Sequence, residues 1–237
     1  MTESLLNNHM KNSPSFSSFR KELDRWDEAQ KYEYETWKPH VEANPKDQPK
    51  HVDEYFEKYF GELLRQDWTG KTVLEIGTGI AGSMWMMNAS RRIGVEPLAD
   101  KLKVFNPKLY ANYEMISHGA ESVPEVADQS VDCVVTFNVL DHCQDVGSII
   151  AEINRILKPG CRLAIGCDLK ATCMYLDVGH PIALSAKWFE KEFEKYKFKT
   201  IKKEVIPSRS IDTATGKDFL DGCLIYIGEK LCQVSQL

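Results

Sequence analysis

Short apolar runs alternate with amphipathic segments over most of the chain. Apolar runs of strand length that are bounded by glycine, proline or charged residues are typical of buried strands. The clearest expected strands are 72–76 and 131–137, with others near 91–96, 113–117, 162–167, 199–206 and 219–228. Helical patterns are expected between them at 81–90, 100–105, 147–157 and 185–196.

Strands that alternate with helices of this length predict a largely parallel sheet with helices on both faces. The last two expected strands have no helical pattern between them. We therefore expect them to pair as an antiparallel hairpin at one edge of the sheet.

The N-terminal part of the chain has a different pattern. Residues 1–18 are rich in serine and asparagine and are expected to be frayed, as chain ends often are. Charged and aromatic residues intermix over 19–42, which predicts one or two amphipathic helices interrupted at Pro39. A second helix is expected over 51–64. We expect residues 1–66 to form a tail and helical cap, and residues 67–237 to form the main domain.

Composition narrows the class of protein. The chain has 237 residues and a formal net charge of -5, which gives no reason to expect nucleic acid as a partner. No apolar run approaches the roughly 20 residues that span a bilayer, and the N-terminus lacks the pattern of a secretory signal. The seven cysteines show no paired Cys/His spacing, so no metal site is expected. These features predict a cytoplasmic protein without a membrane partner.

A glycine loop follows the expected strand 72–76. Gly77, Gly79 and Gly82 let the chain turn tightly and let a ligand approach the backbone. Glu96 ends the next expected strand, where a carboxylate can accept both ribose hydroxyls of a nucleoside. This spacing also fits nicotinamide and flavin enzymes. Glu75 favours a cationic ligand, because its carboxylate would face a bound pyrophosphate unfavourably.

Several motifs in order resemble class I S-adenosylmethionine-dependent methyltransferases. They are Val73 to Gly79, Gly94 to Pro97, Gly119 to Pro124, Asp132 to His142 and Glu152 to Gly160. The resemblance covers about residues 70–228. It implies a three-layer α/β Rossmann-like methyltransferase fold: a mostly parallel seven-stranded sheet with an antiparallel C-terminal hairpin strand, here preceded by the helical cap.

The resemblance also implies a set of residues that bind S-adenosylmethionine and its product, S-adenosylhomocysteine. The set consists of Glu75, Gly77, Thr78, Gly79, Glu96, Pro97, Gly119, Ala120, Glu121 and Asn138. Glu75 would engage the methionine amino end, partly through water, Glu96 would take the ribose hydroxyls, and Ala120 and Glu121 would border the adenine. Asn138 would lie near the methionine part. Three positions depart from the family pattern: Ala81 replaces a third glycine, Gly119 a frequent aspartate, and Cys161 a second glycine.

Acceptor chemistry is expected in the loops that follow the later strands. His142 is a candidate general base, with Asp141 orienting it or binding the acceptor. A histidine that only stabilises this loop is the alternative. Trp37 and Tyr34 could cover the pocket and His180 could bind substrate, although packing and turn roles are the alternatives for these residues.

The predicted reaction is transfer of a methyl group to a small-molecule acceptor through an oxygen or nitrogen nucleophile, by in-line displacement. Two other functions stay open: a non-catalytic S-adenosylmethionine-binding regulatory protein and a nicotinamide-dependent oxidoreductase. The second is disfavoured because the Tyr-x-x-x-Lys spacings, Tyr34/Lys38 and Tyr226/Lys230, fall outside the expected catalytic helix. The oligomeric state is not predicted.

Overall fold

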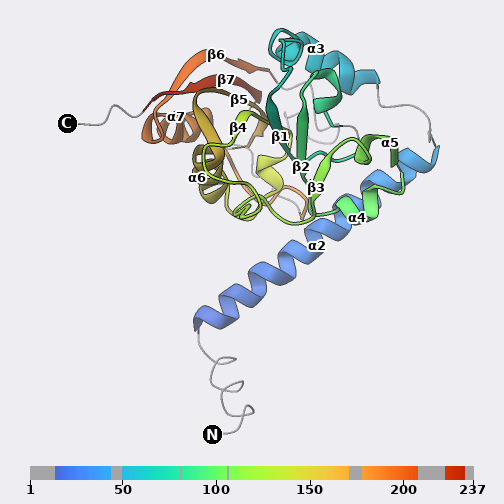
Figure 1. The fold of residues 1–237 in the computed structure, drawn as a ribbon. Coiled ribbons are helices and arrows are strands. Elements are labelled where there is room, and N and C mark those ends of the chain that lie inside the picture. Colours follow the sequence, from blue (N-terminus) through green and yellow to red (C-terminus); the bar gives the residue numbers. More distant parts are fainter. Residues whose placement is uncertain are drawn as a thin grey trace, which may run out of the picture.

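The computed structural model describes residues 14–43, 50–80, 82–105, 107–170, 178–207 and 222–232. Their centre is a seven-stranded sheet with the strand order β3-β2-β1-β4-β5-β7-β6 (Figure 1). The strands are β1 (Thr72–Ile76), β2 (Arg91–Val95), β3 (Glu114–Ile116), β4 (Val131–Phe137), β5 (Leu157–Leu169), β6 (Phe198–Ile206) and β7 (Gly222–Lys230).

Strands β1 to β5 are parallel to one another, whereas β7 is antiparallel to both of its neighbours. β1 pairs in parallel with β2 and β4, β2 with β3, and β4 with β5. β7 is antiparallel to both β5 and β6, and lies between them. The predicted mostly parallel sheet with an antiparallel C-terminal strand is confirmed, and β6 rather than β7 forms the edge.

The helices and short helical turns connect and flank these strands. They are α2 (Pro14–Ala43), α3 (Lys50–Leu64), η1 (Met84–Met86), α4 (Ala99–Leu102), α5 (Pro107–Tyr110), η2 (Leu140–His142), α6 (Val146–Ile156) and α7 (Ala186–Lys195). In Figure 1, α2 runs past α4 at one end and extends away from the sheet at the other.

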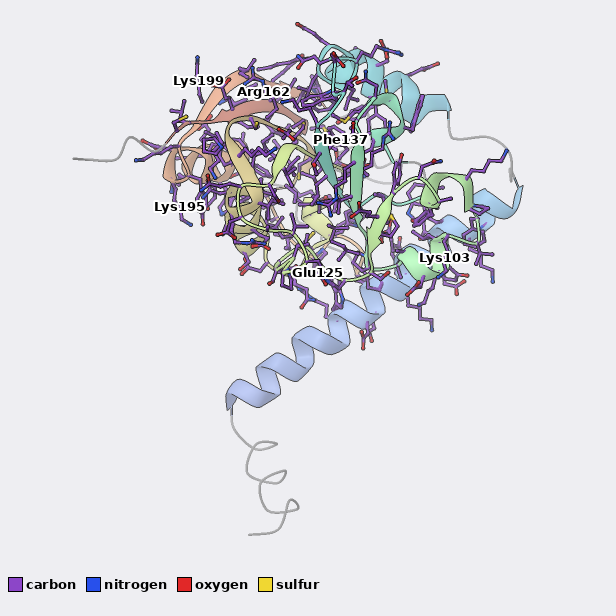
Figure 2. All side chains as sticks on the ribbon, in the orientation of Figure 1. Lys103, Glu125, Phe137, Arg162, Lys195 and Lys199 are labelled. Atoms are coloured by element: carbon purple, nitrogen blue, oxygen red, sulfur yellow. The ribbon has the colours of Figure 1, made fainter. Side chains whose placement is uncertain are left out.

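Alternation along the strands divides the apolar side chains between two cores. On β1, Leu74 and Ile76 join the core that also contains α6 and α7, whereas Val73 joins the core that contains α3 and α4. This is the two-residue period of a strand that is buried on both faces. Figure 2 shows Phe137 inside the molecule, while Lys103, Lys195 and Lys199 reach outward at its periphery.

The helix expected over 81–90 is wrong: among the described residues of this stretch there is only the 3-10 turn η1. Tertiary partners take the backbone groups that a helix would use. The Glu75 carboxylate accepts hydrogen bonds from the Ser83 backbone and hydroxyl, at 2.8 and 2.7 Å. Arg92 donates to the carbonyls of Met84 and Met87. Side chains from two strands therefore hold this segment as a loop.

The N-terminal pattern differs from the prediction at Pro39. α2 continues through this residue to Ala43, so the described chain forms one helix there. α3 begins one residue before its predicted start and ends at Leu64 as expected. The predicted division into residues 1–66 and 67–237 stays a prediction.

Candidate cofactor and acceptor site

A cavity of about 760 Å³ opens at the carboxyl ends of the parallel strands. Loops after β1, β2, β3 and β4 supply one part of its lining, and α2, α3, β5 and β7 supply the rest. Ligands of open α/β sheets bind at this end of the strands. The volume is within the range of roughly 300–1,000 Å³ that is typical of small-molecule sites.

The glycine loop is shaped by a close approach to the loop after β4. Gly77 has a φ of 72°, and a Cβ at this position would lie 2.1 Å from Val139 Cγ2. The Gly77 amide donates to the Val95 carbonyl at 2.7 Å. Both backbone conformation and packing therefore require glycine, and the bare backbone of this loop lines the cavity.

Glu96 presents a buried carboxylate to the same cavity. One oxygen accepts a hydrogen bond from the Gly79 amide and the other from the Leu98 amide, both at 2.9 Å. Burial raises the pKa of Glu96, the two amides oppose this, and the nearby charge of Glu33 on α2 adds to it. Glu96 thus holds the glycine loop and still faces the cavity.

Glu75 is placed differently from the sequence expectation. It is 2% exposed, does not line the cavity, and accepts its hydrogen bonds from Ser83 and Met84. Burial raises its pKa to about 7, against the effect of those hydrogen bonds. Glu75 thus shapes the loop behind the cavity wall, and its expected role at the methionine amino end, partly through water, stays a prediction.

The loop after β3 explains one departure from the family pattern. Gly119, Ala120 and Glu121 line the cavity, and a Cβ at residue 119 would lie 2.4 Å from Glu121 Oε2. Glu121 Oε1 accepts from the backbone amides of Gln144 and Asp145, at 3.1 and 3.3 Å. Glu121 therefore ties this loop to the start of α6.

The remaining predicted cofactor residues also lie on the cavity wall. Thr78, Gly79, Pro97 and Asn138 all line it. Asn138 adopts a left-handed conformation with a φ of 55°, and its amide donates to the Gly166 carbonyl at 2.7 Å. This turn carries the chain from β4 into η2.

The rest of the lining brings together residues that are distant in sequence. α2 contributes Trp26, Gln30, Glu33 and Trp37, α3 contributes Tyr55 and Phe56, and the sheet contributes Phe137, Asp168 and Cys223. Trp37 lies here, as the sequence predicts. Asp168 could have been found from the sequence, because it is a polar residue near the carboxyl end of an expected strand. The other side chains reach the cavity only through tertiary packing.

The structure does not bring Tyr34 to the cavity. Its ring packs 6.0 Å from the ring of Phe105, and Lys101 lies over it. His180 is not one of the lining residues, but its ring centroid lies 4.3 Å from that of His142. His180 thus reaches the site through His142.

Tyr55, Asp168 and Cys223 form a half-buried group on the acceptor wall. The Tyr55 hydroxyl lies 3.6 Å from Cys223 Sγ. A Cβ at Gly166 would lie 2.5 Å from that hydroxyl, so glycine in β5 makes room for Tyr55. Burial and the charge of Asp141 raise the pKa of Asp168.

The two predicted catalytic residues occupy η2. Asp141 is fully buried, with Oδ2 3.5 Å from Lys170 Nζ and Oδ1 3.8 Å from His142 Nε2. His142 lines the cavity, and its Nδ1 lies 3.7 Å from Glu33 Oε2. The indole N–H of Trp37 donates to Glu33 Oε1 at 2.5 Å. A chain of polar groups therefore links α2 to the loop after β4.

Comparisons with known proteins agree with this geometry. Residues 74–165 match the model of a methyltransferase domain. A stretch of 63 residues is 41% identical to the uncharacterized protein YafE of Escherichia coli (strain K12), and it covers 27% of each chain. The chain thus spans about a quarter of that relative.

Solved structures share the fold at low identity. Geranyl diphosphate C-methyltransferase from Streptomyces coelicolor A3(2), in complex with Mg²⁺, geranyl diphosphate and S-adenosyl-L-homocysteine, matches with a TM-score of 0.59 and 15% identity over 77% of this chain and 80% of that chain. The cyclase SpnF matches with a TM-score of 0.62 and 16% identity over 86% of this chain and 94% of that chain.

The strand order and the glycine loop beneath a strand-end carboxylate define the class I Rossmann-like methyltransferase fold. The match over residues 74–165 shows a methyltransferase domain in this part of the chain. A methyltransferase domain of this fold implies S-adenosylmethionine as its cofactor. In the part of the chain that the structure describes, no helix could cross a membrane.

Proposed function

We propose that the protein transfers a methyl group from S-adenosylmethionine to a small-molecule acceptor through an oxygen or nitrogen nucleophile. One observation carries the proposal: a single cavity is lined both by the glycine loop with Glu96 and by a separate group of aromatic and ionisable side chains from α2, α3, β5 and β7. Two ligands can face each other there, as an in-line displacement requires.

The cofactor lies along the strand ends. Gly77, Thr78 and Gly79 pass their backbone close to the methionine and sugar, and Glu96 accepts the ribose hydroxyls. Adenine lies beside Pro97 and the loop of Gly119, Ala120 and Glu121. Asn138 lies near the methionine part. This assignment is supported by the position of these residues in the lining of one cavity.

The acceptor lies under α2 and beside His142, which belongs to the loop after β4. The nucleophile forms a bond to the methyl carbon while the carbon–sulfur bond breaks and its electron pair goes to sulfur, which leaves S-adenosylhomocysteine. Trp37 covers the acceptor, His142 with Asp141 receives its proton, and His180 supports His142. The ring contact between the two histidines and the burial of Asp141 support these roles.

The apolar and aromatic part of the lining favours a small acceptor that is itself partly apolar. Trp26, Trp37, Phe56 and Phe137 supply the surface that such a molecule would cover. The cysteines of the described residues are unpaired thiols, which supports a reducing cytoplasm as the location.

Calorimetric titration with S-adenosylmethionine and S-adenosylhomocysteine tests the proposal first, with NAD and NADP as controls. We expect micromolar binding of the first pair alone, followed by transfer of labelled methyl to an acceptor in a small-molecule screen. Binding of a nicotinamide cofactor would overturn the proposal. Cofactor binding without any methylated acceptor would instead favour a regulatory protein.

The same titration with the variant Glu96→Ala tests the proposed contact between Glu96 and the ribose hydroxyls. Loss of hydrogen bonds between a carboxylate and the ribose hydroxyls is expected to weaken S-adenosylmethionine binding by about 1–3 kcal/mol. Glu114→Ala is the matched control: it removes an exposed carboxylate of the edge strand β3 that is paired with Arg91 of β2. This variant should leave the affinity for S-adenosylmethionine unchanged. Equal affinities of Glu96→Ala and the wild type would contradict the ribose assignment.

A further inference from the structure

Asp141, His142 and His180 bring three metal-ligating side chains together. One nitrogen of each histidine and one carboxylate oxygen all lie within 4.8 Å of one another. The first two residues come from η2, and His180 comes from the chain between β5 and α7. The sequence shows no paired spacing of ligands, because the two contributing segments meet only in the folded sheet.

The burial of this group points to a ligand. Asp141 is fully buried, and among the described residues neither of its oxygens has a hydrogen-bond partner. His142 Nε2, which faces Asp141 Oδ1, is also buried and makes no hydrogen bond within the described chain. Buried polar atoms are almost always satisfied, so two facing orphan atoms indicate a group that binds between them.

The surrounding side chains are arranged as the outer partners of metal ligands usually are. A metal-bound histidine commonly directs its other ring nitrogen to a carboxylate. Here the other nitrogen of His142, Nδ1, faces Glu33 Oε2 at 3.7 Å, and Trp37 holds Glu33 by a hydrogen bond. Lys170 lies at Asp141 Oδ2, on the opposite oxygen from the one that faces His142. Oδ1 therefore stays directed at His142.

We propose that Asp141, His142 and His180 form a binding site for a divalent transition-metal ion at the wall of the acceptor cavity. Two imidazoles and one carboxylate favour zinc, cobalt or iron over magnesium and calcium, which prefer oxygen ligands. Ligand atoms at about 2.0–2.2 Å from an ion lie roughly 3.0–3.5 Å apart. The 3.8 Å between His142 Nε2 and Asp141 Oδ1 thus requires only a small contraction.

The ion would select the acceptor, an inference that rests on the proposed function. Three protein ligands leave open positions, and His142 lines the cavity. With the ion bound, His142 would serve as a ligand in place of receiving the acceptor's proton: a hydroxyl bound to the ion would lose its proton to water more readily, because the cation stabilises the oxygen anion. That anion then attacks the methyl carbon, and the sulfonium leaves as a thioether. The expected acceptor is therefore a small molecule with a metal-binding hydroxyl.

Titration of the full chain with Co²⁺ and Zn²⁺ after treatment with a chelator tests the site without relying on turnover. We expect one Co²⁺ per chain with the visible absorption of a nitrogen- and oxygen-ligated ion, and Mg²⁺ should not compete. His180→Ala and Asp141→Asn should each weaken binding by more than about 100-fold, and Glu33→Gln by about 10-fold. His180→Ala keeps the test decisive if Asp141→Asn does not fold.

His118→Ala is the matched control, because His118 Nε2 also faces a carboxylate, that of Glu125, but at the exposed surface. Its affinity for Co²⁺ should stay within about twofold of the wild type. Absence of binding to the wild type, or equal binding to wild type and His180→Ala, would overturn the site and leave His142 as a general base. Titration with S-adenosylmethionine in the same samples separates this failure from failure of the proposed function.

Discussion

Glu75 and Glu96 are two buried carboxylates on neighbouring strands with different tasks. Glu96 shares its oxygens between two loop amides and the cavity, whereas Glu75 is enclosed by the segment 83–84. An ionised carboxylate is costly to bury in the protein interior unless hydrogen bonds compensate for its lost hydration. The raised pKa of Glu75, about 7, reflects incomplete compensation.

Glu75 should make stability depend on pH. The folded protein holds this proton up to a pKa of about 7, whereas the unfolded chain releases it near 4.5. Because the folded state binds more protons between these values, the free energy of unfolding should fall as pH rises from about 4.5 to 7, by at most about 3 kcal/mol. Urea unfolding followed by tryptophan fluorescence at several pH values measures this.

Glu75→Gln serves as the comparison. Glutamine cannot ionise, so the decline between pH 4.5 and 7 should shrink, although the variant should be less stable overall because its amide group would face the Ser83 N–H. A parallel decline in both proteins would show that another group is responsible.

At the scale of elements, α3 has the helix pattern that the sequence predicts and a packing role that the pattern does not specify. Phe60 is 1% exposed, and its ring centroid lies 4.4 Å from that of Phe137 on β4. Phe56 lies 5.0 Å from the same ring and also lines the cavity. One face of α3 therefore closes a core and borders the site.

Phe60→Ala should cost about 3–5 kcal/mol, since removing a buried ring leaves a cavity that the sheet cannot fill. Chemical denaturation of the variant measures the loss. Glu54→Ala on the exposed side of the same helix should change stability by less than about 0.5 kcal/mol. Similar losses in both would mean that α3 is not packed as described.

At the scale of the whole molecule, α2 contributes to the cavity more than to the cores. Of its described side chains only Ala29 is buried, while Tyr34 and Trp37 are partly buried. The same helix lines the acceptor wall through four residues. This asymmetry supports a cap that covers the site rather than a segment on which the fold depends.

A chain lacking residues 1–43 should therefore fold. We expect it to lose about 2–4 kcal/mol of stability, to bind S-adenosylmethionine within about tenfold of the full chain, and to lose methyl transfer. Circular dichroism, calorimetry and a labelled-methyl assay measure the three quantities. Failure to fold would show that α2 is part of the core, and retained methyl transfer would contradict its role at the acceptor.

The sheet and its cofactor edge could be predicted because their signals are local. The runs 72–76 and 131–137 have the same bounds in the prediction and the structure. The predicted cofactor residues, apart from Glu75, come from short loops directly after strands, and parallel strands bring all such loops to one edge. Over 81–90 the helix expected from the local pattern does not form. The Ser83 amide donates to Glu75 and Arg92 donates to the Met84 carbonyl, and only the folded sheet provides these partners.

By itself the sequence determined the class of fold and the edge of the sheet at which the cavity opens, since these depend on contiguous segments. Only the tertiary structure decided which other residues line the cavity. Tyr55, Asp168 and Cys223 come from α3, β5 and β7, and meet because β7 inserts beside β5. His180 and His142 also meet only in the folded chain. Their ring centroids lie 4.3 Å apart, although their spacing in the sequence gives no sign of this contact.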